Sequence, residues 1–146
     1  MKGIKMGAKK PVVLWLSRHK PISSQIEYLR HKLGDYVLVQ YARPLPTVEK
    51  ALELVEMYGA DYVVPVLPMT FIMRLVEESK KRGFKVLRAD MQLLHYCSSR
   101  PCPDFRPQTD VVIESKDLET GGKIYRHFRF RGFKLLKDVR LVEGDW

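Results

Sequence analysis

Residues 62–89 read YVVPVLPMTFIMRLVEESKKRGFKVLRA, and this stretch decides the fold class. Its first part, residues 62–67, is a short apolar run that is typical of a buried strand. Apolar residues then recur at helical spacing over residues 71–76, and the pattern ends at Gly83, a residue that commonly terminates a helix. Residues 84–89 form the next apolar run. The stretch therefore predicts two strands joined by a helix, and such a crossover makes the strands parallel.

The same alternation precedes this stretch. Residues 12–16 are an apolar, partly β-branched run that predicts a buried strand. A helix should follow, with Ser24 and Glu27 at capping-box spacing near its start. Residues 36–41 predict the second strand, and Thr47 predicts the N-cap of the next helix. Three such alternations predict an α/β fold, Rossmann-like or flavodoxin-like, in which a mostly parallel sheet lies between helices in a three-layer sandwich.

The pattern changes after the fourth predicted strand. Residues 91–108 contain three prolines and two cysteines and show no sustained period, which predicts a long loop. Residues 109–146 predict antiparallel C-terminal strands, a β extension that either continues the sheet or forms a small appendage. No linker separates these parts. We therefore expect a flexible basic tail over residues 1–10 and a single α/β domain over 11–146, with a Rossmann-like core over 11–92.

The charge of the chain is strongly basic. It has 26 Lys and Arg against 17 Asp and Glu, for a formal net charge of +9. Residues 1–20 carry six bases and no acid, and residues 121–146 carry seven bases and three acids, so the excess lies at the two ends. A basic surface attracts phosphate-bearing partners, so we expect a nucleotide or a nucleic acid; a soluble surface without such a partner is the alternative.

The longest apolar stretch, residues 62–73, is interrupted by two prolines and is too short to span a bilayer. We therefore expect no membrane partner and a cytoplasmic location. The chain contains no Asn and only four Gln, a composition that indicates a thermophilic source because heat deamidates these side chains.

Ligands of open α/β sheets bind beyond the carboxyl ends of the strands. The polar residues expected there are Ser17, Arg18, His19 and Lys20 after the first strand, Arg43 after the second, Thr70 after the third and Asp90 after the fourth. Hydroxyl, guanidinium, ammonium and imidazole groups beside the start of a helix suit a phosphate. The alternative is that the loop bases are merely solvated. No GxGxxG, GxxxxGK[ST] or GxSxG motif is present, so we expect no dinucleotide cofactor, Walker-type ATP site or nucleophile elbow.

The basic strand predicted within residues 123–134 is a second candidate site. Strand alternation gives it one apolar face, and the other face carries Tyr125, His127, Arg129 and Arg131. Such a strand can hold a nucleic-acid backbone and stack a base. Its basic residues are Lys123, Arg126, Arg129, Arg131 and Lys134. A solvated basic edge that discourages aggregation explains the same residues.

Three residues of the kinds that bind metals, one histidine and two cysteines, lie close together in the predicted loop. His95, Cys97 and Cys102 can supply three zinc ligands, with Asp90 or Asp104 as an oxygen donor. A local disulfide between the two cysteines is the second interpretation. Structural zinc sites usually show two close ligand pairs, so the spacing favours the third interpretation, two unpaired thiols, and we assign no metal ligand from the sequence.

Three segments carry a resemblance to other proteins: VVLWLSRHKP at 12–21, SSQIEYL at 23–29 and GADYVVPVLPMTFIMRLVEESKKRGFKVLRADMQ at 59–92. In layout the chain resembles a set of small Rossmann-like proteins from archaea, phages and CRISPR loci. Some members look like CRISPR-associated domains that bind cyclic oligoadenylates, and some of those are metal-independent ring nucleases. The resemblance implies that Ser17, His19 and Thr70 lie in a ligand pocket.

The sequence therefore predicts a protein, expected to be a homodimer, that binds a nucleotide phosphate. Cleavage of a phosphodiester is an optional further activity. In it the ribose 2′-hydroxyl would attack in line, Arg18 or Lys20 would stabilise the developing charge, and His19 would transfer a proton. The alternative is a DNA- or RNA-binding module that uses the C-terminal strands and the N-terminal tail. An adaptor without a small ligand is a third hypothesis.

Overall fold

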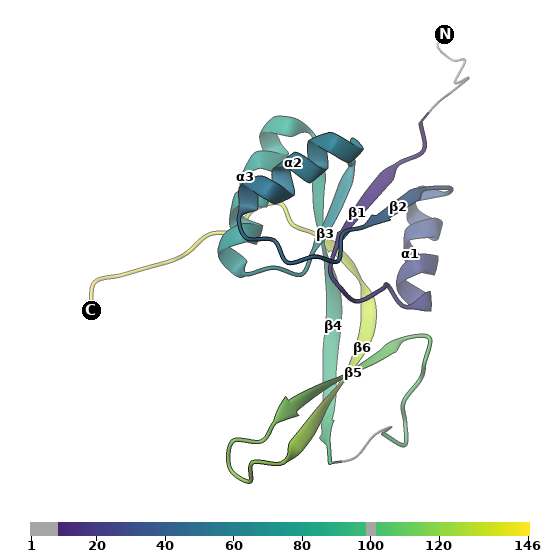
Figure 1. Cartoon of the computed structure of the whole chain (residues 1–146), viewed down its shortest axis with the longest axis vertical. Coiled ribbons are helices and arrows are strands. Elements are labelled where there is room, and N and C mark those ends of the chain that lie inside the picture. Colours follow the sequence, from purple (N-terminus) through teal and green to yellow (C-terminus); the bar gives the residue numbers. More distant parts are fainter. Residues whose placement is uncertain (1–8, 99–101) are drawn as a thin grey trace. The chain divides into compact units, whose positions relative to one another are not determined.

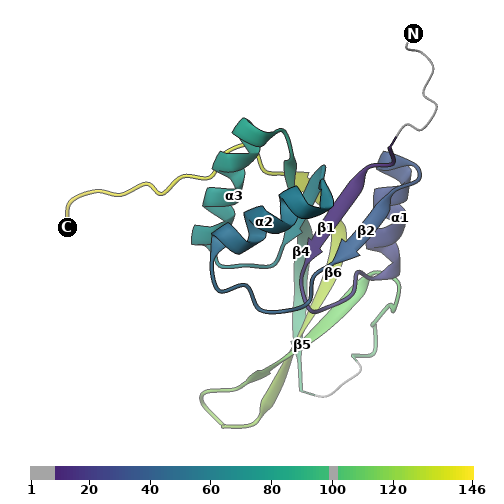
Figure 2. The same cartoon turned by 45° about the horizontal axis from the view of Figure 1, so that its top comes forward.

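The structure, a computed structural model, describes residues 9–98 and 102–146 and is a mixed α/β fold (Figure 1, Figure 2). The elements are β1 (Val12–Leu16), α1 (Ser23–Leu33), β2 (Val37–Gln40), α2 (Val48–Tyr58), β3 (Tyr62–Pro65), α3 (Met69–Arg82), β4 (Lys85–Cys97), β5 (Asp110–Lys116) and β6 (Lys123–Leu135). The strands form one sheet in the order β2-β1-β3-β4-β6-β5. The first four strands pair in parallel and β5 pairs antiparallel with β6. The predicted mixed α/β class with antiparallel C-terminal strands is confirmed, and these strands extend the sheet.

The chain is organised as two compact units. The first contains residues 9–20, 33–88 and 135–146, and the second contains residues 21–32 and 89–134. Both β4 and β6 therefore contribute residues to each unit.

The first unit is built around β1, which pairs with β2 on one side and with β3 on the other. All five residues of β1 are buried, as a central parallel strand requires. Helices α2 and α3 lie next to each other in both views (Figure 1, Figure 2), and their apolar residues join those of β1 in one core. Thr47 caps α2 by accepting a hydrogen bond from the Lys50 amide, and Gly59 ends it with φ at 58°, as the sequence predicts.

The second unit places α1 against β6. The ring of Tyr28 meets those of Phe130 and Phe133 edge-on, with centroid separations of 5.9 and 5.6 Å. Gly132 has φ at 135°, and a Cβ atom there would lie 3.1 Å from Cε2 of Tyr28. Only glycine fits this close approach without strain. The amide of Ser24 donates to the carbonyl of Gln108, which ties the start of α1 to the segment before β5.

Two local predictions were wrong. Residues 91–97 were expected in a loop, but they continue β4. Most side chains of this part of the strand are only partly buried, so its sequence shows no clear alternation of polar and apolar residues. The predicted capping box of Ser24 and Glu27 does not form, because α1 begins one residue earlier. Gln25 takes the capping role instead, and its Oε1 accepts a hydrogen bond from the amide of Ile22 at 2.9 Å.

No helix in the described part of the chain is long and apolar enough to cross a membrane. Of the predicted basic tail, residues 1–8 lie outside the described residues, and Lys9 and Lys10 are exposed.

Candidate functional site

The carboxyl ends of three parallel strands meet at one edge of the first unit. The amide of Tyr41 donates to the carbonyl of Trp15 at 2.9 Å, and the amide of Val66 donates to the carbonyl of Leu16 at 3.1 Å. The strand order reverses between β1 and β3, which is where ligands of open α/β sheets bind. We call this region the carboxyl edge; it consists of residues 17–20, 41–47 and 66–70.

The structure places most of the predicted ligand residues on the carboxyl edge. These residues are Ser17, Arg18, His19, Lys20, Arg43 and Thr70. Ser17 is partly buried and positions the first loop, since its Oγ accepts from the His19 amide at 3.1 Å and its carbonyl accepts from Nε2 of Gln40 at 2.9 Å. The other five residues are exposed. Whether they bind a ligand stays a prediction.

Asp90 does not lie where the sequence predicted. It was expected just beyond the end of the fourth strand, but β4 continues to Cys97, so Asp90 lies inside the strand. It also belongs to the second unit rather than to the unit that holds the carboxyl edge. We therefore remove Asp90 from the candidate site.

The carboxyl edge is basic and contains no acidic residue. Its three bases, Arg18, Lys20 and Arg43, are exposed and form no ion pair within residues 9–98 and 102–146. The acid that follows this edge most closely in the sequence, Glu49, pairs with Arg74 at 3.6 Å. The local field therefore favours an anion.

The prediction that β6 has a solvent-facing basic face is wrong for the centre of the strand. His127 was expected to face solvent, but it is fully buried, and Arg129 is only 24% exposed at its side chain. The reason is cross-strand pairing, because Asp110 of β5 lies directly opposite Arg129 and attracts both side chains.

The other basic residues of β6 are partly engaged as well. Lys123 lies 3.7 Å from Glu114, and the guanidinium of Arg126 stacks over the Phe128 ring at 5.6 Å. Arg131 and Lys134 are exposed, and no ion pair of theirs occurs among the described residues. This strand therefore offers fewer available bases than the sequence suggested.

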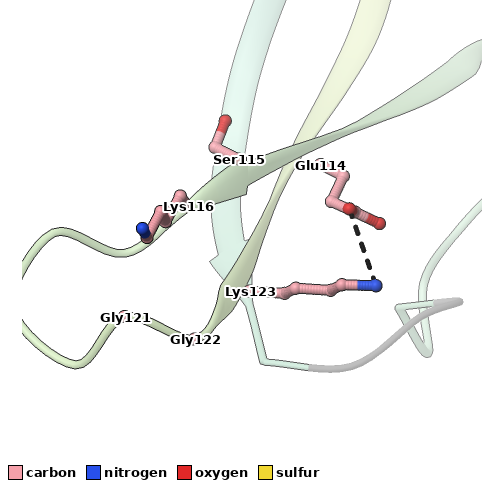
Figure 3. A pocket seen from close by; sticks show the side chains of 6 residues that line it. All are labelled: Glu114, Ser115, Lys116, Gly121, Gly122 and Lys123. Carbon is pink, nitrogen blue, oxygen red and sulfur yellow. Dashed lines mark ion pairs between the residues drawn. The ribbon is translucent and has the colours of Figure 1, made fainter.

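A hollow of about 340 Å³ lies at the end of the β5–β6 hairpin (Figure 3). It is lined by Glu114, Ser115, Lys116, Gly121, Gly122 and Lys123. Lys123 pairs with Glu114 at 3.7 Å, so Lys116 is the one charged side chain of the lining outside this pair.

A buried polar network connects β5 and β6. Asp110 accepts two hydrogen bonds from Arg129, from Nε at 2.8 Å and from Nη2 at 2.9 Å, and it lies 2.6 Å from Nε2 of His127. The Arg129 hydrogen bonds hold the pKa of Asp110 well below its usual range, although burial raises it. Asp110 is therefore ionised and accepts the hydrogen that Nε2 of His127 carries.

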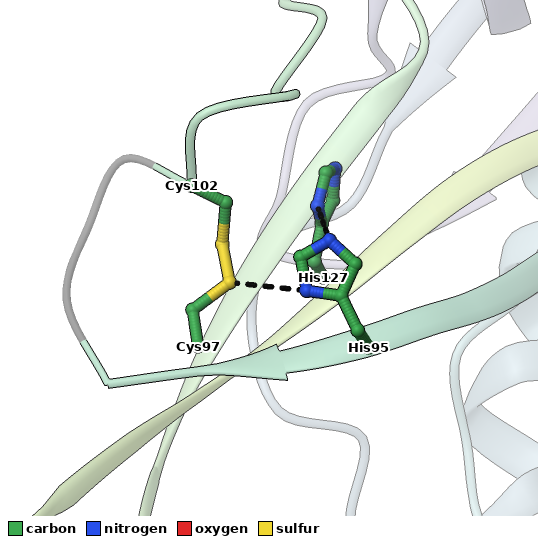
Figure 4. A group of neighbouring side chains, drawn as sticks. All are labelled: His95, Cys97, Cys102 and His127. Atoms are coloured by element: carbon green, nitrogen blue, oxygen red, sulfur yellow. Dashed lines mark hydrogen bonds between the residues drawn. A yellow bond between two sulfur atoms is a disulfide. The ribbon is translucent and has the colours of Figure 1, made fainter.

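The network continues into a cluster of His95, Cys97, Cys102 and His127, whose potential ligand atoms all lie within 4.8 Å of one another (Figure 4). Nδ1 of His127 lies 3.2 Å from Nε2 of His95, and Nδ1 of His95 lies 3.4 Å from Sγ of Cys97. The two cysteines form a disulfide, so the interpretation as unpaired thiols was wrong.

His127 is the residue that the sequence reasoning missed in this cluster. The sequence indicated Asp90 or Asp104 as the fourth polar group, and Asp104 does lie 3.1 Å from Nε2 of His95. His127 is far away in the sequence, and it joins the cluster because β6 lies next to β4, the strand that carries His95 and Cys97. The hairpin register of β5 and β6 brings His127 next to Asp110, but it does not by itself place His127 beside His95.

The chain matches no protein-family profile, no curated protein and no solved structure. The function is therefore argued from the geometry of these sites.

Proposed function

We propose that the protein binds a nucleotide through its phosphate groups at the carboxyl edge, within a Rossmann-like three-layer fold. The observation that carries this proposal is the charge of the edge: Arg18, Lys20 and Arg43 have no acidic partner in the described residues, and no acid lies among the residues of the edge. Bases that no carboxylate neutralises are available to phosphate oxygens, and a guanidinium can donate two parallel hydrogen bonds to them.

The start of α3 adds hydrogen-bond donors to the same edge. The N-cap residue Pro68 makes no side-chain capping hydrogen bond. The amides of Met69 and Thr70, in the first turn, have no acceptor within the helix by its geometry. A phosphate at this position would also benefit from the positive end of the helix dipole.

Two exposed apolar side chains favour a nucleotide over inorganic phosphate. Val66 and Met69 flank the start of α3 and are 65% and 56% exposed. A base or ribose packed on them would bury apolar surface that otherwise faces water. The same chemistry suits a cyclic oligonucleotide, which presents several phosphates and bases together.

Phosphodiester cleavage is a second part of the proposal. His19 is exposed and lies between Arg18 and Lys20 in the sequence, so its imidazole is accessible for transfer of a proton at a bound phosphodiester. A His19→Ala variant should then bind a cyclic oligoadenylate with near wild-type affinity and cleave it at least about tenfold more slowly. An unchanged rate would remove His19 from the mechanism.

The alternative, a nucleic-acid-binding module, receives less support from the geometry. Arg129 is committed to Asp110, Lys123 lies beside Glu114 and Arg126 stacks over the Phe128 ring. Arg131 and Lys134 are the exposed bases of β6 that remain for a backbone. This alternative is kept as an outcome of the binding test.

The test is a titration with a fluorescent cyclic oligoadenylate. Lys20→Ala should weaken binding about tenfold or more, because a hydrogen bond to a charged group contributes about 1.5–3 kcal/mol. Lys85→Ala is the matched control, since Lys85 is an exposed lysine at the amino end of β4. Arg131→Glu should also leave binding unchanged. If Arg131→Glu abolishes binding while Lys20→Ala has no effect, the ligand binds on β6, as the nucleic-acid alternative requires, and the carboxyl-edge proposal is wrong.

A further inference from the structure

We propose that His95, Cys97, Cys102 and His127 bind one Zn²⁺ when the two cysteines are reduced. The inference concerns the second unit and is independent of the proposed nucleotide site. It assigns a structural role to the cluster shown in Figure 4.

The distances approach those of a tetrahedral site. Zinc binds nitrogen at about 2.0–2.1 Å and thiolate sulfur at about 2.3 Å, so its ligand atoms lie about 3.3–3.8 Å apart. Each histidine supplies one ring nitrogen. Nδ1 of His95 is 3.4 Å from Sγ of Cys97, and Nδ1 of His127 is 3.2 Å from the other ring nitrogen of His95. All potential ligand atoms fall within 4.8 Å. Once the disulfide is broken and the two sulfurs separate, side-chain rotations can bring the four ligand atoms to these distances.

The hydrogen-bond pattern leaves lone pairs that point at one another. Asp110 fixes the hydrogen of His127 on Nε2, so Nδ1 presents a lone pair. If neutral His95 donates its Nε2 hydrogen to that lone pair, its own Nδ1 lone pair faces Cys97, whose disulfide sulfur has no hydrogen to donate. Moving the hydrogen of His95 to Nδ1 leaves two nitrogen lone pairs face to face. With the cysteines reduced, a cation bound by Nδ1 of each histidine and by both thiolates takes up these lone pairs and leaves the Nε2 hydrogen of His95 for Asp104.

The surroundings of the cluster are those of a metal site. Ligating histidines usually donate their second ring hydrogen to a carboxylate, which fixes the ring and its tautomer. Asp110 has this relation to His127, and the bidentate ion pair with Arg129 holds Asp110 in place. Asp104 lies 3.1 Å from Nε2 of His95 and can position that ring in the same way.

Four protein ligands leave no open position, so the zinc would be structural rather than catalytic. Cys102 and His127 are buried, at 2% and 0% exposure. The ion would join the end of β4, the segment that follows it, and β6. Its role would be to stabilise this second unit.

The zinc state and the disulfide use the same sulfur atoms and exclude each other. A dithiol reductant transfers two electrons to the Cys97–Cys102 disulfide, becomes a disulfide itself and leaves two protein thiols. Zn²⁺ then binds both sulfurs as thiolates, and two protons pass to water. The cluster thereby links metal binding to the redox state of the chain.

The test uses the full chain reduced with dithiothreitol and desalted without oxygen. Co²⁺ should bind with the intense visible absorption of a tetrahedral thiolate site, saturate at one ion per chain, and be displaced by Zn²⁺. The Cys102→Ser variant should lose this spectrum. His31→Gln should keep it, because His31 is exposed on α1 outside the cluster.

A second measurement needs no variant. Zn²⁺ should protect both cysteines of the reduced wild-type chain from alkylation, followed by mass spectrometry, and a chelator should restore their reactivity. The proposal is overturned if the reduced wild-type chain gives no tetrahedral Co²⁺ spectrum, if Cys102→Ser retains that spectrum, or if Zn²⁺ leaves both thiols reactive.

Discussion

Replacing Asp110 with Asn tests the buried network most sharply. The Asp110 carboxylate accepts hydrogen bonds from Arg129, His127, Thr109 and the amide of Arg106. An asparagine keeps the shape but loses the charge, and its amide turns two hydrogens toward groups that are themselves donors. Disrupting a buried ion pair by changing one partner costs about 3–5 kcal/mol.

The lower end of that range applies here. The side chain of Arg129 is 24% exposed, so water replaces part of the lost interaction, whereas that of His127 is fully buried. We therefore expect Asp110→Asn to lower the free energy of unfolding by about 3 kcal/mol. For a chain of this size that corresponds to a fall in Tm of about 6–12 °C.

The assay is urea denaturation at neutral pH of the oxidised, chelator-treated protein, so that no metal contributes. Asp138→Asn is the matched control, because Asp138 is 42% exposed and pairs with Arg140 and Lys80 at the surface. The control should lose less than about 1 kcal/mol. An Asp110→Asn variant no less stable than the control would refute the reasoning.

Three further predictions concern stability. Leu75→Ala should lower the free energy of unfolding by about 2–5 kcal/mol in the same assay, because Leu75 is fully buried in the core of the first unit. Gly132→Ala should cost about 1–3 kcal/mol, because the residue has φ at 135° and its Cβ would press on Tyr28; an unchanged midpoint would contradict this. Burial raises the pKa of Glu78, but hydrogen bonds led by that from Arg82 outweigh it and hold the pKa below the ordinary 4.5. Ionised Glu78 therefore contributes stability above about pH 4.5 that is lost as the pH falls through its lowered pKa. In urea denaturation at acid pH, the free energy of unfolding of Glu78→Gln should fall less with decreasing pH than that of the wild-type protein.

The elements of the first unit could be predicted because their signals are local. The buried run 12–16 became β1 with the same bounds, and Thr47 and Gly59 set the ends of α2 through contacts within a few residues. The parallel pairing of the first four strands was also predicted, because strand–helix–strand crossovers join parallel strands.

The second unit was harder to predict because its contacts are long-range. The extension of β4 to Cys97 depends on neighbouring strands rather than on its own alternation. The burial of His127 depends on Asp110, a residue 17 positions away that the hairpin register brings to the same place. A solvent-facing basic strand and a buried ion-pair network can have the same pattern of residue types along one strand. They are distinguished only by the residue on the neighbouring strand, here Asp110 opposite Arg129.

The carboxyl edge holds most of the predicted ligand residues because loops after parallel strands reach one edge whatever their composition. The prediction for Asp90 was wrong because it depended on where β4 ends, and the strand continues seven residues beyond Asp90 to Cys97.

The most direct measurement of the proposed function is NMR mapping of backbone amides during titration with a cyclic oligoadenylate. A nucleotide site at the carboxyl edge predicts that the largest shifts occur at residues 17–20 and 66–70 and at Arg43. Shifts confined to residues 123–134, or no shifts at all, would contradict a nucleotide site at the carboxyl edge.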